Sequence, residues 1–395
     1  MNSDTAVVLR DLVFVGGGHA HVGALKCLAR YRLPGVRVSL ISSDQRTPYS
    51  GMLPGYVAGH YGYDDVHIDL RRLASFAGAR FLCDEVVGVD RGRRTVLCRN
   101  RPPVAYDRLS LNVGSTPAVD RVPGAAEFAI AVKPIGQFNE RWLALLERVR
   151  RSSAPLTIAV VGAGVAGIEL LLAMQYRLQY ELELELDASE RGRLGRLGVS
   201  FHLFSAGHHI LPTHNARVRE KLETLLAARG VVVHRAAEVS RVFRGGLQTR
   251  DGQLLAADEV VWVTQAGGVP WLRDTGLELD SGGFIRVSDT LQTVSDPFIF
   301  AVGDCAAMVG TALEKAGVFA VRQGPPLAEN LRRSLLGKPL RAWRPQRRWL
   351  ALISTGDRYA IASRGAWQSE GAWVWRWKDW IDRRFMARFS DLPTD

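Results

Sequence analysis

Two glycine-rich segments carry the clearest chemistry in this sequence, and each lies inside a strand-turn-helix pattern. The first is Gly16-Gly17-Gly18-His19-Ala20-His21, and the second contains Gly162, Gly164 and Gly167. Each segment follows an apolar, β-branched run and precedes an apolar run at helical spacing. Glycines at these positions let the backbone approach a pyrophosphate, and the helix N-terminus supplies amide donors and a partial positive charge. We therefore predict two phosphate-binding loops in one chain.

The two loops fit the G-x-G-x-x-G pattern unequally. In the first, His21 occupies the third glycine position, which normally allows close packing of helix on strand. The second has all three glycines. At the place of the acid that usually binds the ribose, the first half has Ser42 and Ser43, with Asp44 one residue later. In the second half that acid is missing, and Ser205 stands near its place. His208 and His209 are the only polar neighbours of Ser205 with partial positive character, so the choice between NADH and NADPH stays open, as does a site that binds neither.

A third signature lies at residues 293–304, where an apolar strand pattern ends in Gly303-Asp304. A carboxylate at the C-terminal end of such a strand can accept a hydrogen bond from a ribityl hydroxyl. Two phosphate loops together with this strand indicate two dinucleotides held face to face, a flavin and a nicotinamide.

The chain is long enough for two or three domains, with 395 residues. A hydrophobic content of 47% and a charged content of 23% are typical of a soluble globular protein. We predict an α/β fold with two Rossmann-like, three-layer dinucleotide-binding domains, the second inserted in the first, and a C-terminal hairpin-helix element. The expected boundaries are residues 1–135 and 290–340 for the FAD-binding domain, 153–289 for the NAD(P)-binding domain, and 341–395 for the C-terminal element. Residues 180–186 fit either a strand or the end of a helix.

The basic charge is concentrated at the C-terminus. Lysines and arginines number 51 against 40 acidic residues, and residues 331–395 hold 14 of the basic and 6 of the acidic ones. The same segment holds seven of the ten tryptophans. From Trp377 onward, apolar residues recur at nearly helical spacing with arginines between them, which suits both packing on the FAD half and contact with an anionic membrane surface. No nucleic-acid-binding module is present, so nucleic acid is not an expected partner.

Cysteines are few and widely spaced. Cys27, Cys83, Cys98 and Cys305 form no close pair of the kind found in redox dithiols or metal knuckles. His19 and His21 have no nearby carboxylate or cysteine, so no metal site is expected. The N-terminus lacks the features of a signal peptide, and we expect a cytoplasmic protein that lies peripherally on the inner face of the membrane.

The sequence resembles the pyridine nucleotide-disulfide oxidoreductase superfamily in residues 16–21, 264–270 and 299–305. Residues 47–55 (TPYSGMLPG), 315–324 (KAGVFAVRQG) and 377–385 (WKDWIDRRF) resemble the branch of type II NADH dehydrogenases and sulfide:quinone oxidoreductases. Within that branch they look most like the flavoprotein domain associated with selenide, water dikinase (selenophosphate synthetase).

The resemblance implies FAD in the first half and NAD(P)H in the second. The residues expected to contact the cofactors are Gly16, Gly17, Gly18, His19, Ala20, Ser43, Pro48, Tyr49, Val86, Gly114, Gly162, Gly164, Gly167, Gly303 and Asp304. Glu169 matches a position close to the nicotinamide, and Lys315, at the expected start of a helix, matches one beside the flavin. We assign both a catalytic role, in which Glu169 helps to position the nicotinamide and Lys315 balances charge on the reduced flavin. A solvated helix lysine is the plain alternative for Lys315.

The sequence thus predicts an FAD-dependent NAD(P)H dehydrogenase that passes electrons to a quinone-like acceptor, because the thiol pairs of related enzymes are absent. A second hypothesis is a flavoenzyme that oxidises a sulfur or selenium compound. A third is a flavin-bound sensor module with a degenerate nicotinamide site. Expected partners are a quinone or another small acceptor, a membrane surface, a second copy of the chain, and selenophosphate synthetase.

Overall fold

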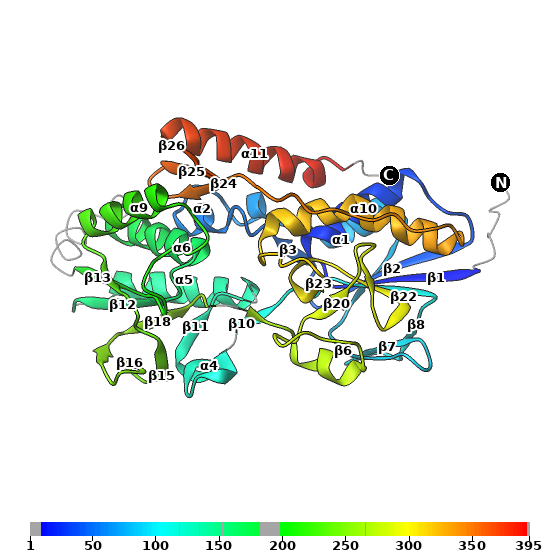
Figure 1. Cartoon of the computed structure of the whole chain (residues 1–395), viewed down its shortest axis with the longest axis horizontal. Helices are drawn as coiled ribbons and strands as arrows, with labels where there is room; N and C mark the ends of the chain where they lie inside the picture. The colour runs from blue at the N-terminus through cyan, green and yellow to red at the C-terminus, as the bar shows by residue number, and fades with distance from the viewer. Residues whose placement is uncertain are drawn as a thin grey trace.

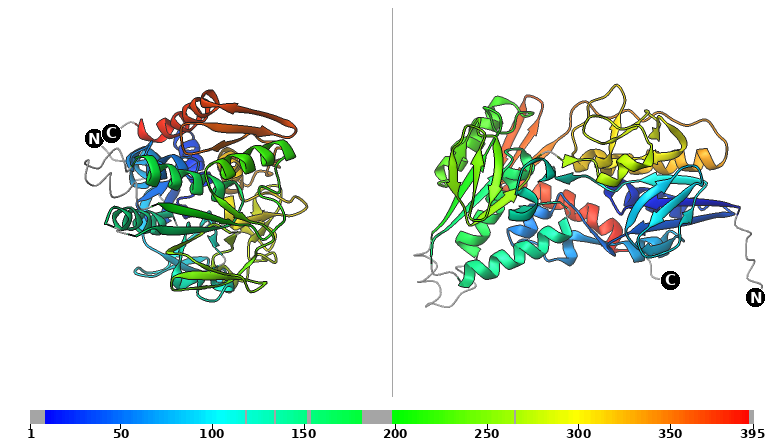
Figure 2. Two further views of the ribbon diagram at one scale, coloured as in Figure 1. Left: turned by 90° about the vertical axis from the view of Figure 1, so that its left-hand side faces the viewer. Right: turned by 90° about the horizontal axis from the view of Figure 1, so that it is seen from below.

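The computed structural model describes residues 9–117, 119–133, 135–151, 154–181, 198–264 and 266–392. Two α/β halves lie side by side along the long axis of the molecule, and the C-terminal helix α11 (Ala372–Ser390) lies across the top of both (Figure 1). Figure 2 shows the same division from the end and from below. The prediction of two Rossmann-like halves followed by a hairpin-helix element is confirmed.

The first half is built on a mostly parallel sheet in the order β23-β20-β21-β22-β9-β1-β2-β5. Its strands are β1 (Arg10–Val15), β2 (Val36–Ser42), β5 (Arg80–Cys83), β9 (Arg108–Leu111), β20 (Ile285–Val287), β21 (Gln292–Thr293), β22 (Asp296–Ala301) and β23 (Ala306–Met308). Helices of this half are α1 (His19–Arg30), α3 (Leu70–Phe76) and α10 (Gly317–Leu335). Helix α2 (Leu53–Val57) comes from the same part of the chain but packs in the core of the second half. Smaller strands are β3 (Arg46–Pro48), β4 (His67–Asp69), β6 (Val86–Asp90), β7 (Thr95–Cys98) and β8 (Val104–Ala105).

The second half is built on a parallel sheet in the order β11-β18-β12-β13-β14. Its strands are β11 (Ala129–Ala131), β12 (Leu156–Val161), β13 (Val199–Phe204), β14 (Val232–His234) and β18 (Glu259–Trp262). A separate antiparallel sheet contains β15 (Val239–Phe243), β16 (Gly246–Thr249) and β17 (Leu254–Ala256). The helices are α4 (Ala125–Phe128), α5 (Ile135–Arg151), α6 (Val165–Tyr176) and α9 (Ala216–Ala228).

The two chain segments that connect the halves pair with each other. β10 (Thr116–Pro117) leaves the first half and pairs antiparallel with β19 (Ala266–Gly267), which returns to it. The expected domain boundaries remain a prediction, but strands pair across them: β11 joins the second sheet before residue 135, and β20 joins the first before residue 290. Most of the segment 180–186 lies outside the described residues; the part that is described, Tyr180 and Glu181, ends a π-helical turn over Arg177–Glu181.

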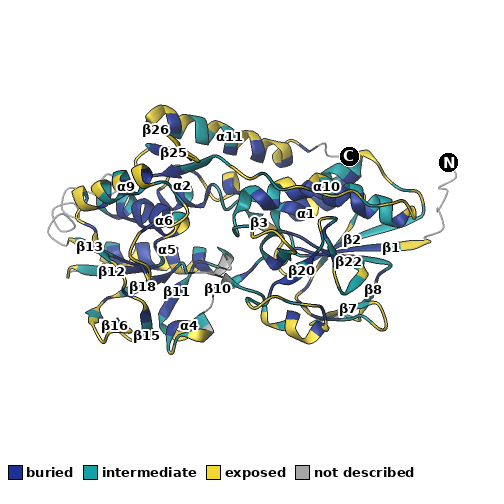
Figure 3. Ribbon diagram, in the orientation of Figure 1, coloured by how far each residue is buried: buried dark blue, intermediate teal, exposed yellow. Residues whose placement is uncertain are grey.

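The C-terminal element consists of a small antiparallel sheet and helix α11. Its strands are β24 (Ala351–Ser354), β25 (Ala360–Arg364) and β26 (Trp367–Gly371), so the expected hairpin has a third strand. On α11, Phe385 and Phe389 are buried in the core of the first half, which confirms the packing role of the tail. Trp380, by contrast, is 56% exposed and Trp373 is 51% exposed, and Figure 3 shows exposed residues along the outer side of this helix.

Candidate functional site

The first glycine loop forms a tight turn between β1 and α1. Gly16 has a φ of +91°, and a Cβ there would lie 2.4 Å from the carbonyl oxygen of Asn112. Gly18 is the N-cap of α1 and offers no side chain to the first helical amides. Those amides are therefore available to a phosphate, as the sequence predicts.

Asn112, directly after β9, gives evidence for a ligand at the same loop that is independent of the glycines. A Cβ on Gly18 or on Gly303 would lie within 2.6 Å of its side chain. Its Nδ2 is buried and has no hydrogen-bond partner. An orphaned buried donor beside an uncapped helix N-terminus calls for an acceptor from outside the protein. The phosphate and ribityl oxygens of a flavin dinucleotide fit that requirement.

His21, in the third glycine position, connects the loop to β9 through its two ring nitrogens. Its Nδ1 lies 2.7 Å from the carbonyl oxygen of Gly16, and its Nε2 lies 2.8 Å from Oγ of Ser110 on β9. The ring is fully buried, and burial lowers the pKa of His21 to about 3. Close helix packing is provided instead by α10, where a Cβ on Gly324 would lie 3.1 Å from Cα of Gly23 on α1.

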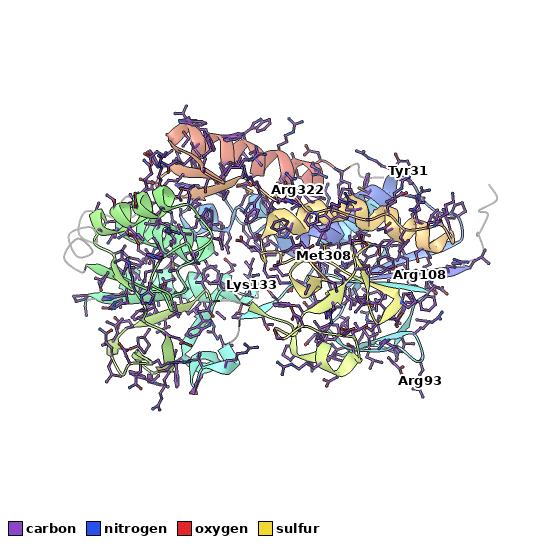
Figure 4. All side chains as sticks on the ribbon, viewed as in Figure 1. Tyr31, Arg93, Arg108, Lys133, Met308 and Arg322 are labelled. Atoms are coloured by element: carbon purple, nitrogen blue, oxygen red, sulfur yellow. The ribbon has the colours of Figure 1, made fainter. Side chains whose placement is uncertain are left out.

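Asp304 lies just after Gly303, as expected, and has a partner that the sequence did not reveal. Lys133, from the connection that follows β11, donates its ammonium to Oδ2 of Asp304 at 2.5 Å and to Ser115 at 3.1 Å. Burial raises the pKa of Asp304, but the ammonium of Lys133 outweighs it, so the net pKa lies below the usual range. Figure 4 places Lys133 where the two halves meet. A single lysine outside any motif gave no signal in the sequence.

Lys315, Asp304 and Gly303 line one small hollow. Lys315 precedes α10 rather than starting it, since that helix begins at Gly317. Its ammonium donates to the carbonyl of Ala306 at 2.5 Å and lies 3.9 Å from the ring centroid of Phe284. Burial lowers the pKa of Lys315. The side chain is therefore held in place, which argues against a freely solvated helix lysine.

The second glycine loop fits its pattern completely. Gly162 has a φ of +121°, and a Cβ on Gly167 would lie only 1.8 Å from the carbonyl oxygen of Gly162. Gly164 is the N-cap of α6, without a side-chain cap, and a Cβ there would meet nothing within 4 Å. Gly162 and Gly167 are thus required by the backbone geometry, and Gly164 faces open space, as the pattern predicts for the glycine that a pyrophosphate approaches.

Glu169 is buried on α6, where it meets the C-terminal element. Its Oε1 accepts the backbone amide of Ser354 on β24 at 2.8 Å. Burial, opposed by the ammonium of Lys378, raises the pKa of Glu169 to about 7. Lys378, on α11, donates to Asp382 at 2.6 Å and to the carbonyl of Gly51 at 2.6 Å. Burial lowers the pKa of Lys378, but the carboxylates of Asp382 and Glu169 outweigh burial, so its net pKa is raised.

The network around Glu169 continues into the first half through residues 47–55. Tyr49 stacks on Phe385 of α11 at 4.5 Å between ring centroids, and its pKa is raised by burial and by Asp382. The rings of His19 and Tyr49 lie 5.3 Å apart, edge to face. Burial lowers the pKa of His19 to about 4, against the opposing field of Asp304. Helix α11 thus connects the two glycine-loop halves, a contact that no sequence motif indicates.

The remaining expected cofactor residues come from four separate segments of the first half. Gly114, with a φ of +74°, follows β9, and a Cβ on it would meet nothing within 4 Å. Pro48 ends β3, and Val86 begins β6 with its side chain in the hydrophobic core. Ser43 lies exposed after β2, where its hydroxyl donates to Asp44 at 3.0 Å.

The cysteines are not arranged for thiol chemistry. Cys305 is fully buried, and burial raises its pKa to about 11, as expected of a packed small residue. All four cysteines are free. Among the described residues, no group of three or more histidines, cysteines or acids is placed to bind a metal ion.

A scan against protein-family models matches residues 10–331 to the pyridine nucleotide-disulphide oxidoreductase family. The chain belongs to this family. The match spans both glycine loops and Asp304, so the predicted superfamily is confirmed.

Individual relatives agree with the predicted branch of this oxidoreductase family. The NADH dehydrogenase-like protein YutJ of Bacillus subtilis is 27% identical, over 76% of this chain and 78% of its own length. The type II NADH:quinone oxidoreductase of Haemophilus influenzae is 26% identical, over 64% of this chain and 61% of its own length.

Solved structures show the same fold. NDH2 from Plasmodium falciparum, in complex with NADH, superposes with a TM-score of 0.79 at 14% identity, over 97% of this chain and 99% of that one. The sulfide:quinone oxidoreductase of Aquifex aeolicus superposes with a TM-score of 0.77 at 16% identity, over 96% and 92% of the two chains.

Proposed function

We propose that this protein is an FAD-dependent oxidoreductase that transfers electrons from NAD(P)H to a quinone-like acceptor. The observation that carries the proposal is a network across the two halves: Lys378 of α11 donates to Asp382, and its charge acts on Glu169 of the second half. Asp382 in turn interacts with Tyr49 of the first half. The family match to an oxidoreductase and the relatives named for NADH:quinone chemistry support it.

The first loop and its surroundings would hold FAD. Gly16, Gly17 and Gly18 would allow close backbone approach, the amides of His19 and Ala20 would donate to the pyrophosphate, and Asp304 would accept from a ribityl hydroxyl. Ser43, Pro48, Tyr49, Val86, Gly114 and Gly303 complete the proposed contacts. When bound, the flavin supplies two-electron transfer between nicotinamide and acceptor.

The protein's own contribution is charge and proton placement. Lys315 and Lys133 put two ammonium groups near Asp304, so the site is suited to negative charge that develops on the cofactor. Glu169, with a pKa of about 7, exchanges a proton near neutral pH, and Lys378 lies in the same network. We propose that Glu169 supplies a proton to the reduced acceptor, since a group titrating near the operating pH is best suited to that task.

The outer face of α11 is the proposed membrane contact. Trp373 and Trp380 are exposed, and the guanidinium of Arg384 lies 5.2 Å from the Trp380 ring centroid. Tryptophan with arginine suits the headgroup region of an anionic bilayer. None of the described helices is long and apolar enough to span a membrane. Such a surface contact would place a lipid-soluble quinone close to the Glu169 network.

A second candidate is oxidation of a sulfur or selenium compound, favoured by the similarity of fold to the sulfide:quinone oxidoreductase. The free, dispersed cysteines disfavour a persulfide relay. The partnership with selenophosphate synthetase and the homodimer remain predictions from the sequence.

Anaerobic stopped-flow spectroscopy tests these candidates. Purified protein is mixed with NADH or NADPH, and the reduced protein is then mixed with a quinone, or oxidised protein with sulfide or selenide. We expect nucleotide to bleach the flavin absorbance and quinone to restore it. Bleaching by sulfide or selenide but not by nucleotide would support the second candidate, and bleaching by neither would support the sensor hypothesis. A colourless protein that takes up no FAD would refute all three.

A further inference from the structure

The loop after β13 is held against the second glycine loop. β12 and β13 pair in parallel, with Val161 opposite Phe204. The amide of Gly162 donates to the carbonyl of Phe204 at 3.0 Å, and the amide of Leu211 donates to the carbonyl of Ala163 at 2.9 Å. In a Rossmann half, the residues that follow this strand face the adenosine ribose of the dinucleotide. Residues 205–211 therefore determine what the ribose 2′ position meets.

This loop contains no carboxylate. Its sequence is Ser-Ala-Gly-His-His-Ile-Leu from Ser205 to Leu211. An NAD-specific site places an acid here, which accepts a hydrogen bond from the 2′-hydroxyl and repels a 2′-phosphate. The hydroxyl of Ser205 instead donates to the carbonyl of His209 at 3.2 Å, within the loop. The repulsive element against a 2′-phosphate is thus missing.

The neighbouring strand supplies a cation at the same edge. The amide of Ser205 donates to the carbonyl of His234, the last residue of β14, at 2.9 Å, and Ala236 donates to Gly207 at 3.0 Å. These bonds place Arg235, between His234 and Ala236, directly beside the loop. Its side chain is 48% exposed and forms an ion pair with Glu223 of α9 at 3.0 Å. Arg235 is thus anchored beside the loop through its backbone neighbours, and its guanidinium is shared with one acid.

Four imidazoles lie in or beside this loop. His208 and His209 are exposed in the loop. His202 and His234 stack beneath it, with Nδ1 of His202 2.9 Å from Nε2 of His234. Burial lowers the pKa of both stacked rings, so they are neutral partners rather than additional charges. Arg235 is therefore a permanent cation beside the loop, and Glu223 is an acid that competes for it.

We propose that the nucleotide donor is NADPH rather than NADH, with the 2′-phosphate bound by Arg235 next to the acid-free loop of Ser205, Ala206 and Gly207. This selection rests on the proposed function of the second half as a nicotinamide nucleotide site. Arg235 exchanges Glu223 for the phosphate, since a guanidinium binds a phosphate through charge-assisted, bidentate hydrogen bonds.

Equilibrium binding to the FAD-loaded protein tests the selection without turnover. Isothermal titration calorimetry is carried out with NADP⁺ and NAD⁺, and with the fragments 2′,5′-ADP and 5′-AMP. We expect the 2′-phosphorylated member of each pair to bind at least about tenfold more tightly. In Arg235→Gln, most of the preference for the 2′-phosphorylated ligand should be lost, and the affinity for NAD⁺ should be unchanged. Arg250→Gln is the matched control, an exposed arginine of the same half paired with Glu238.

Two further variants test the direction of the effect. Glu223→Gln frees Arg235 and should tighten NADP⁺ binding, and Ala206→Asp should weaken NADP⁺ by at least about tenfold through repulsion. Flavin content and melting temperature verify that each variant is folded. Tighter binding of NAD⁺ than of NADP⁺ by wild type, or no change in the ratio in Arg235→Gln, would overturn the inference alone. Binding of neither nucleotide by a folded, FAD-loaded protein would overturn it together with the proposed donor.

Discussion

Ser354, in the first strand of the C-terminal sheet, donates its backbone amide to the buried carboxylate of Glu169 at 2.8 Å. The two residues are separated by most of the second half and by the return to the first. Because of this contact, the C-terminal element forms part of the site around Glu169. Lys378 of α11 adds a second link, because it bonds both Asp382 on its own helix and the carbonyl of Gly51.

Glu169→Gln should lower turnover with a quinone by about 10²-fold, because an amide cannot exchange the proton that general acid catalysis requires. Flavin content and nucleotide binding should be unchanged. The pH profile of kcat should lose an ionisation near the pKa of Glu169, about 7. Unaltered turnover and an unaltered profile would refute the proton-donor role.

The same variant has a predicted stability signature. The pKa of Glu169 is raised from 4.5 to about 7, so the folded state holds a proton that the unfolded state has already released. Stability should therefore fall as pH rises through this window in wild type. Urea denaturation at pH 5 and pH 8 should show that fall to be smaller in Glu169→Gln.

Gly164→Ala and Gly167→Ala should distinguish an effect on nucleotide binding from an effect on folding. A Cβ on Gly164 meets no protein atom within 4 Å, whereas one on Gly167 lies 1.8 Å from the carbonyl of Gly162. We expect Gly164→Ala to melt like wild type but to bind nucleotide at least about tenfold more weakly, because the methyl group occupies the approach of the pyrophosphate. Gly167→Ala should lower the melting temperature as well. Equal nucleotide affinity in Gly164→Ala and wild type would contradict the assignment.

Lys133→Met should weaken FAD binding by about tenfold, since it removes a charge-assisted bond to Asp304 and a cation from the cofactor site. Flavin release during equilibrium dialysis measures the effect. Lys338→Met, at an exposed position after α10, is the control for loss of one positive charge. Similar losses of FAD in both variants would show that net charge, not the contact, matters.

His21→Gly restores the third glycine of the pattern but should destabilise the protein by about 3 kcal/mol, because it leaves a cavity and unpaired groups at Gly16 and Ser110. Ala29→Gly on the same helix controls for the helix propensity of glycine. Burial lowers the pKa of His21 from 6.5 to about 3, so wild-type stability should fall as pH drops through that range. Chemical denaturation should show that the stability of His21→Gly depends less on acid pH than that of wild type. A variant more stable than wild type would contradict the structural role of His21.

Trp373→Ala combined with Trp380→Ala should reduce binding to vesicles that contain anionic lipid, because both rings are exposed on the outer face of α11. Co-sedimentation measures the bound fraction, and binding should also fall with added salt. Leu254→Ala, an apolar position that is 65% exposed in the second half, is the control. Equal sedimentation of the double variant and wild type would rule out this face as the membrane contact.

The sequence determined the local parts of this protein. Both glycine loops, the strand that precedes Gly303 and Asp304, and several of the strands and helices around them were predictable, because a phosphate loop depends on glycines at fixed local spacing. The same locality explains why His21 could be noticed as a departure, although its bonds to Gly16 and Ser110 could not be foreseen.

Only the tertiary structure decided which residues share a site. Lys133 and Asp304 are 171 positions apart, and Glu169 and Ser354 are 185 positions apart. No periodicity or motif encodes such pairs, because they depend on how the second half is inserted into the first and where α11 comes to lie. The tail shows the same limit: its spacing predicted a helix, but packing against the first half buried Phe385 and Phe389 and left Trp380 outside. Burial, and with it the shifted pKa values of Glu169 and His19, follows from that packing rather than from the order of the residues.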